Sequence, residues 1–214
     1  GINVSGGQIA VGSNIKLGSA GVVTATSFKG DGSGLTGVSA GLSTDEYENT
    51  SGGIRALDSM SAGNATDNTA IGYEALTANT TGDYNTAVGS NALDANTTAN
   101  YNTAVGADAL TANTTGTKNT GIGYEALEGT TTGSYNTSVG SNSLKSNTTG
   151  VSNNALGQAA LGSNTTGSNN VAIGLDALAT QQTANDNTAV GYFALKANTT
   201  GTRNTGIGVS TLDT

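Results

Sequence analysis

The chain contains no cysteine, histidine, proline or tryptophan among its 214 residues. The absence of cysteine excludes disulfides and thiolate metal sites. Without histidine and cysteine, the commonest general base and the thiol nucleophile are both missing. We therefore expect no catalytic residues, no metal ion and no cofactor.

Aromatic residues, positive charge and long apolar runs are also scarce. Aromatic residues make up 4% of the chain, and the formal net charge is −8. A chain with this charge is poorly suited to neutralise phosphates, so nucleic-acid binding is not expected. No segment approaches the roughly eighteen uninterrupted apolar residues of a membrane span, so we do not expect a membrane-embedded protein. The polar composition is typical either of a disordered linker or of a thin, hydrogen-bonded solenoid.

What the chain does contain is a seventeen-residue repeat, present in nine copies without insertion or deletion. An asparagine opens each copy: Asn68, Asn85, Asn102, Asn119, Asn136, Asn153, Asn170, Asn187 and Asn204. A glycine follows four residues later: Gly72, Gly89, Gly106, Gly123, Gly140, Gly157, Gly174, Gly191 and Gly208. A leucine follows four residues after that: Leu76, Leu93, Leu110, Leu127, Leu144, Leu161, Leu178, Leu195 and Leu212. Disorder requires no such register, so the repeat predicts stacked units that bury their apolar side against their neighbours.

The consensus of one copy is N-T-A-[IV]-G-x-x-A-L-x-x-N-T-T-G-x-x. Its first part alternates, with Thr69 and Ile71 on one side and Ala70 on the other, as in a half-buried strand. We expect a second short strand at Ala75 and Leu76, and then a turn in which Asn79 and Gly82 take positive φ. Two short strands joined by turns predict one coil of a parallel β-solenoid, so the fold class is all-β.

The fixed residues have physical roles in such a stack. Asn85, Asn102 and Asn119 are predicted to lie one above another and to form a hydrogen-bonded side-chain ladder, as stacked asparagines do in cross-β structures. The repeated glycine marks a tight bend or a close approach of another chain, where a side chain would clash. One coil buries little apolar surface against the entropy of ordering its backbone. We therefore expect an obligate homotrimer that buries the Ala and Leu faces on a common axis.

Three segments follow from these patterns. Residues 1–44 are read as a strand-rich Gly/Ser fibre shaft, residues 45–67 as a connector, and residues 68–214 as the repeat solenoid. The loop "GDGSG" at residues 30–34 admits a Ca²⁺ or phosphate site, but it lacks the ligand series of an EF-hand and the lysine of a P-loop. A shaft turn is the favoured interpretation of this loop.

Paired carboxylates are the remaining route to catalysis, as in a glycosidase acting on polysaccharide. Glu74 and Glu125 occupy the same position of the repeat, but Asn91, Asn142 and Phe193 stand there in other copies. A solvated, charged face of a rod is the favoured interpretation.

The N-T-T runs match the pattern of N-glycosylation acceptors at Asn79, Asn96, Asn113, Asn147, Asn164 and Asn198. In a regular repeat, turn chemistry is the favoured explanation. The same runs suggest an ice-binding threonine array, but adjacent strand residues point to opposite faces, so Thr80 and Thr81 do not form one.

Six tyrosines occupy two positions of the repeat. Tyr73, Tyr124 and Tyr192 follow the glycine, whereas Tyr84, Tyr101 and Tyr135 precede the asparagine. Exposed tyrosines on a rigid rod are candidate receptor contacts that stack on sugars. The favoured alternative is that they cover neighbouring coils or the seams between chains.

Two segments carry resemblances to known families. "NNVAIGLDALA", residues 169–179, resembles the repeat of YadA-like trimeric autotransporter heads, which implies a homotrimer of left-handed parallel β-rolls. "GVVTATSFKGDGSGLTGVS", residues 21–39, is similar to a segment of fibre proteins of tailed bacteriophages, especially those that infect cyanobacteria. The resemblances imply an intertwined homotrimeric fibre on the virion, with other virion proteins and a host-surface glycan or protein as partners. The alternative they leave open is an adhesin head on a bacterial cell surface.

Overall fold

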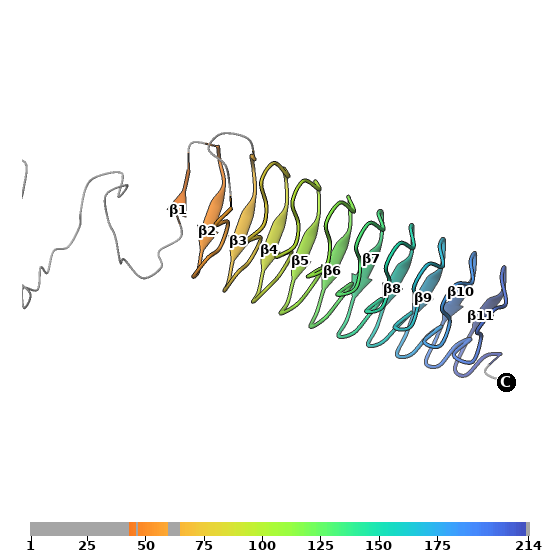
Figure 1. Cartoon of the computed structure of the whole chain (residues 1–214). Coiled ribbons are helices and arrows are strands. Elements are labelled where there is room, and N and C mark those ends of the chain that lie inside the picture. The colour runs from red at the N-terminus through yellow and green to blue at the C-terminus, as the bar shows by residue number, and fades with distance from the viewer. Residues whose placement is uncertain (1–42, 46, 60–64, 213–214) are drawn as a thin grey trace, which may run out of the picture. The chain divides into compact units, whose positions relative to one another are not determined.

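The second to fourth residues of each repeat, T-A-[IV] in the consensus, form a three-residue strand. The computed structural model describes residues 43–45, 47–59 and 65–212. Its strands are β1 (Ser43–Thr44), β2 (Thr50–Gly52), β3 (Thr69–Ile71), β4 (Thr86–Val88), β5 (Thr103–Val105), β6 (Thr120–Ile122), β7 (Thr137–Val139), β8 (Asn154–Leu156), β9 (Val171–Ile173), β10 (Thr188–Val190) and β11 (Thr205–Ile207). They form one sheet in chain order (Figure 1). The fold is an all-β parallel β-solenoid of about nine turns, as the repeat predicted.

Consecutive coils pair in parallel without a register slip. In β3 and β4, Thr69 lies opposite Thr86 and Ala70 lies opposite Ala87, a step of one repeat. The stack also extends into residues 45–67, the predicted connector, because β2 pairs in parallel with β3. The short β1 pairs antiparallel with β2 and so covers the N-terminal edge of the sheet. The predicted shaft before residue 43 and the loop at residues 30–34 lie outside the described residues.

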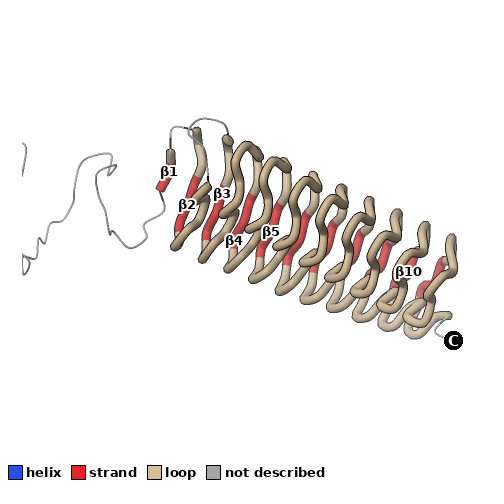
Figure 2. The backbone as a smooth tube through the Cα atoms, viewed as in Figure 1, coloured by secondary structure: helices blue, strands red, loops and turns tan. Residues whose placement is uncertain are grey.

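The prediction of two strands per coil is wrong. Each described coil has one strand, followed by turns (Figure 2). At the expected second strand, Leu76 has a φ of 54° and Glu74 a φ of 54°, which is left-handed backbone. The N–H of Glu74 donates to the carbonyl of Ile54 in one neighbouring coil, and the N–H of Leu76 donates to Ala92 in the other. These hydrogen bonds between coils stabilise a backbone that otherwise costs an L-residue about 1–2 kcal/mol.

The N-T-T-G segment does turn, with the N–H of Gly82 donating to the Oδ1 of Asn79 at 3.1 Å, but the expectation of positive φ there is wrong. Neither Asn79 nor Gly82 has a positive φ, whereas Gly72 has a φ of 139° and Tyr84 a φ of 57°. The chain therefore bends at residues on either side of the strand. Asn79 instead points into the coil, where its amide donates to the carbonyl of Gly82 at 2.9 Å.

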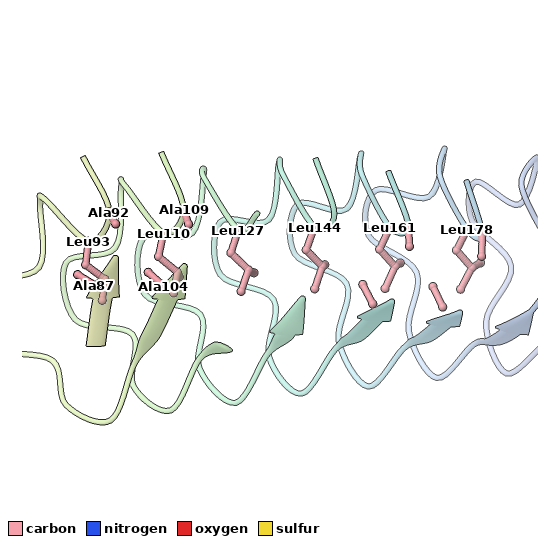
Figure 3. Packing of buried hydrophobic residues seen from close by; sticks show 14 of the residues in the cluster. Ala87, Ala92, Leu93, Ala104, Ala109, Leu110, Leu127, Leu144, Leu161 and Leu178 are labelled. Carbon is pink, nitrogen blue, oxygen red and sulfur yellow. The ribbon is translucent and has the colours of Figure 1, made fainter. Parts of the chain in front are cut away.

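The core of the solenoid lies inside each coil of a single chain. Ala87, Ala92 and Leu93 are fully buried in one coil, and Ala104, Ala109 and Leu110 in the next (Figure 3). The Ala and Leu faces are therefore closed within the chain, which overturns our reason for expecting a trimer. In a coil this narrow, the inward residue of the strand is small, whereas Thr and the aliphatic residue point outward.

Two asparagine ladders run through the stack. In the first, the Oδ1 of Asn85 accepts the backbone N–H of Asn102 at 3.0 Å, and the Oδ1 of Asn102 accepts that of Asn119 at 2.9 Å. The amide of Asn102 also donates to the carbonyl of Gly116 at 2.9 Å, which ties the strand to the following turn. The predicted ladder is confirmed, although most of its links run from side chain to backbone.

The second ladder is formed by the asparagine of N-T-T-G. The amide of Asn96 donates to the Oδ1 of Asn79 at 3.1 Å, and the amide of Asn113 donates to the Oδ1 of Asn96 at 3.1 Å. The next coil carries Thr130, which has no amide to continue the series. The Oδ1 of Asn113 is consequently buried with no hydrogen-bond partner.

The repeated glycine lies at the corner after the strand. Gly106 has a φ of 137°, and a Cβ added there would lie 2.4 Å from the carbonyl oxygen of Gly123 in the next coil. The corner therefore excludes other residues on two grounds, backbone conformation and contact with the neighbouring coil. The predicted clash is confirmed, and its cause is the next coil of the same chain.

We expect Gly106→Ala to lower the free energy of unfolding by at least about 2–3 kcal/mol, because the φ is one that only glycine adopts easily. Gly162→Ala is the matched control: no positive φ occurs at Gly162, and the equivalent residue of the next coil is Ala179. Urea denaturation followed by circular dichroism measures both. Equal midpoints for the two variants would contradict the corner geometry.

We expect Thr130→Asn to raise the free energy of unfolding by about 1 kcal/mol, because its amide would donate to the unpaired Oδ1 of Asn113. Thr132→Asn, at an exposed position two residues further on, is the control and should leave stability unchanged. Thermal unfolding of the three proteins checks this. A melting temperature of Thr130→Asn at or below that of the wild type would show that the ladder does not need this link.

Candidate recognition surface

The outward side of the sheet carries partly exposed aliphatic residues in every coil from β3 to β11. We call it the sheet face and define it as the first and third residues of β3 to β11. Thr69 and Ile71 are partly exposed on either side of the buried Ala70. The stacked third residues form a continuous aliphatic row: Ile71, Val88, Val105, Ile122, Val139, Leu156, Ile173, Val190 and Ile207. Extended exposed apolar surfaces of this kind mark interaction sites.

The sheet face was not predicted as a site. Sequence reasoning placed the interacting surface on Ala and Leu, which the structure buries inside the coil. The signal was present in the strand alternation, because a three-residue strand with alanine in the middle directs its two larger side chains to the same side. Choosing the outward side required knowing that one chain closes the coil by itself.

Two columns of variable residues border the sheet face. The leading column is the residue before each ladder asparagine: Asp67, Tyr84, Tyr101, Lys118, Tyr135, Ser152, Asn169, Asp186 and Arg203. The trailing column is the residue after each corner glycine: Tyr73, Ser90, Ala107, Tyr124, Ser141, Gln158, Leu175, Tyr192 and Val209. The six candidate tyrosines thus lie at the two opposite corners of the sheet.

The leading column forms a run of aromatic and charged contacts. The rings of Tyr84 and Tyr101 stack with centroids 5.1 Å apart and an interplanar angle of 1°. The ammonium group of Lys118 lies 5.2 Å from the ring centroid of Tyr135. The charge of Asp67, together with its hydrogen bond, raises the pKa of the Tyr84 hydroxyl. Because Tyr84 and Tyr101 cover one ring face of each other, stacking on a sugar is restricted to the remaining faces.

The tyrosines of the trailing column are separated from one another by smaller residues. Tyr73, Tyr124 and Tyr192 are each about half exposed. A hydrogen bond to Glu125 raises the pKa of the Tyr124 hydroxyl. Tyr192 stacks on Phe193 with centroids 3.9 Å apart. Tyr73 and Tyr124 therefore project without an aromatic neighbour in their column, whereas Tyr192 is stacked on Phe193.

The structure does not bring together the two carboxylates that the sequence singled out. Glu74 and Glu125 lie three coils apart, roughly 14 Å at the spacing of paired strands, whereas glycosidase carboxylates are about 5–10 Å apart. Lys145 binds the carboxylate of Glu125 at 2.5 Å and lowers its pKa. In residues 43–45, 47–59 and 65–212, no group of three or more Asp or Glu side chains is placed to hold a metal ion.

The N-T-T runs do not present asparagines to solvent in most coils. Asn79, Asn96, Asn113, Asn147 and Asn164 are fully buried in the second ladder. Thr80 is partly buried, with its hydroxyl donating to the carbonyl of Thr97, whereas Thr81 is exposed. The two threonines therefore differ in exposure. Neither lies in a strand, so the objection based on strand alternation is not tested by them.

Comparisons with known proteins add no assignment. No family model matches the sequence, no curated protein matches it, and no solved structure matches it. No helix with the length and apolar character of a membrane span occurs in the described part of the chain.

We expect a double-mutant cycle on Tyr84→Ala and Tyr101→Ala to give a coupling free energy of about 0.5–1.5 kcal/mol, because the rings stack. The rings of Tyr84 and Tyr135 lie three coils apart and do not stack. The same cycle on Tyr84→Ala and Tyr135→Ala should therefore give a coupling free energy within about 0.5 kcal/mol of zero. Urea denaturation provides the four free energies of each cycle. Equal coupling in both cycles would contradict a specific ring contact.

Proposed function

We propose that this chain is a rod segment of a homotrimeric adhesive fibre, in which three copies bury their sheet faces against one another. The observation that carries the proposal is the uninterrupted aliphatic row along the outward side of the sheet, beside a core that each chain closes alone. Association would remove this row from water, at about 25 cal/mol for each Å² of apolar surface.

Several features support a structural role over an enzymatic one. The stack is regular from β3 to β11, and ladders of buried amides link each coil to the next. A stiff rod repeats any surface contact at fixed intervals, and three copies multiply it further, so weak contacts with a cell surface gain avidity.

The setting we propose is the external fibre of a bacteriophage virion, with other virion proteins and a host-surface glycan or protein as partners. The support is the resemblance of residues 21–39 to tailed-phage fibres. The second candidate is a trimeric adhesin head on a bacterial surface, supported by the resemblance of residues 169–179 to autotransporter repeats. A coiled-coil stalk and membrane anchor in the same protein would favour the adhesin, and attachment of its N-terminal end to a virion would favour the phage fibre.

We expect the chain to sediment at three times its mass of 20.8 kDa. Val88→Lys with Val105→Lys places charges in the aliphatic row and should shift the protein to a folded monomer, because unpaired charges would be buried at the interface. Thr98→Lys with Thr115→Lys adds the same charges on an exposed column away from the sheet face and should leave the trimer intact. Analytical ultracentrifugation with circular dichroism reads both mass and fold.

A folded wild-type monomer at micromolar concentration would overturn the trimer, and a dimer would replace it with a two-chain rod. A trimer that survives the charges at Val88 and Val105 would show that another surface joins the chains. Binding of fluorescent trimer to bacterial cells and to a glycan array then tests adhesion. Binding to neither would leave the fibre a spacer and overturn the adhesive part of the proposal.

A further inference from the structure

We infer that the three copies meet corner to corner and in register. The trailing column of one copy packs against the leading column of the next. We call the leading and trailing residues that flank one strand a level, and residues of the same level meet across the seam. The inference rests on the proposed trimer. It goes further because it names the residues of the seam and excludes other registers.

The direction of the strands decides which corners meet. Every strand from β3 to β11 runs parallel to its neighbours, from the leading column to the trailing column. In a ring of three such chains related by rotation, the end of one strand faces the start of the strand in the next copy. Each seam therefore joins a trailing column to a leading column.

The residues at equal levels are complementary in charge and aromaticity. The three tyrosines of the trailing column all fall at levels where the leading column is charged: Tyr73 with Asp67, Tyr124 with Lys118, and Tyr192 with Asp186. A phenol hydroxyl donates well to a carboxylate, and a tyrosine ring attracts an ammonium group. Lys118 already lies over the ring of Tyr135, which holds its ammonium group near this corner.

The residues at equal levels are also complementary in size. The tyrosines of the leading column fall at levels where the trailing column is small: Tyr84 with Ser90, Tyr101 with Ala107, and Tyr135 with Ser141. Large side chains facing small ones fill a seam at the density of a protein interior. No level carries a tyrosine at both corners.

Other registers lose this complementarity. A shift of one level puts Tyr101 opposite Tyr124 in one direction, and puts Tyr84 opposite Tyr73 in the other. A shift of two levels puts Tyr84 opposite Tyr124 or Tyr101 opposite Tyr73. Of these five registers, only the unshifted one keeps tyrosine away from tyrosine.

Contacts within one chain link residues along the leading column, such as Lys118 and Tyr135, but do not pair the leading column with the trailing column. The two residues of one level, for example Lys118 and Tyr124, are separated by a strand and lie at opposite corners of the sheet. At the strand rise of about 3.3 Å per residue, their Cα atoms are on the order of 15 Å apart. The pairing acquires a physical meaning only when a second copy supplies the other corner.

Disulfide trapping tests the seam cleanly because the chain has no cysteine of its own. Ser152→Cys with Gln158→Cys places one thiol on each corner of the same level and leaves all the tyrosine pairs intact. Two further double variants report a shift of one level in either direction: Ser152→Cys with Ser141→Cys, and Ser152→Cys with Leu175→Cys. Ser152→Cys with Ala107→Cys, three levels apart, is the distant control.

Each full-length variant is first shown by ultracentrifugation to be a trimer under reducing conditions, then oxidised and run on a denaturing gel without reductant. We expect the equal-level pair to form covalent trimers at least tenfold faster than the distant control and faster than both one-level pairs, because disulfides need Cα atoms within about 7 Å. Fastest trapping by a one-level pair would overturn the register. No trapping above the distant control would overturn the seam itself. Both results leave the trimer standing, whereas a monomer at the first step contradicts the proposed function instead.

Discussion

The structure depends on one repeated contact, in which an asparagine side chain accepts the backbone N–H of the asparagine one coil further along. The Oδ1 of Asn68 accepts from Asn85 at 2.9 Å, and the contact recurs to Asn204 at 2.9 Å. These groups are buried, so each would carry a desolvation penalty if the coils slipped by one residue. The contact therefore fixes which residues of consecutive coils lie one above another. It does not fix the length of a coil, because the N–H of Asn68 donates to the Oδ1 of Asn49 at 2.9 Å across a step of 19 residues. With the asparagines aligned, the corner glycines lie against one another, and an added Cβ at Gly106 would clash with Gly123.

This narrow interior determines where the chain can vary. The coil holds two alanines and one leucine in its core, so inward positions tolerate few residues, and serine is accepted where its hydroxyl finds a carbonyl, as Ser138 does at Ser143. Larger and charged side chains are found in columns at the corners and on the turns, where side chains meet water. Charge pairs such as Lys196 with Asp176, at 2.9 Å, lie in these columns and add little stability at their exposure. The coils therefore differ from one another mainly in the side chains that they place in each exposed column.

The repeat made much of this predictable, including the parallel stack, the ladder asparagines, the crowded glycine and the strand at Thr69–Ile71. The second strand was not predictable, because Ala75 and Leu76 read as a short apolar run, whereas alternating left-handed residues are needed to turn so small a coil. The prediction that Ala and Leu face a neighbouring chain was wrong for a related reason. A pattern of alternation defines two sides but does not say which one encloses the core, and only the closure of the coil decides it.

The closed core also changes what association can contribute. If Ala and Leu had been exposed, three chains would have been needed to fold at all, and the oligomer would follow from stability alone. Since each chain buries them by itself, any association uses a second, independent surface whose residues are free to encode register. The corner columns have that property, because their side chains lie outside the core that closes the coil. Contacts along one column, such as the stacking of Tyr84 on Tyr101, occur within a chain, whereas the match between the two columns level by level acquires a role only at a contact between chains.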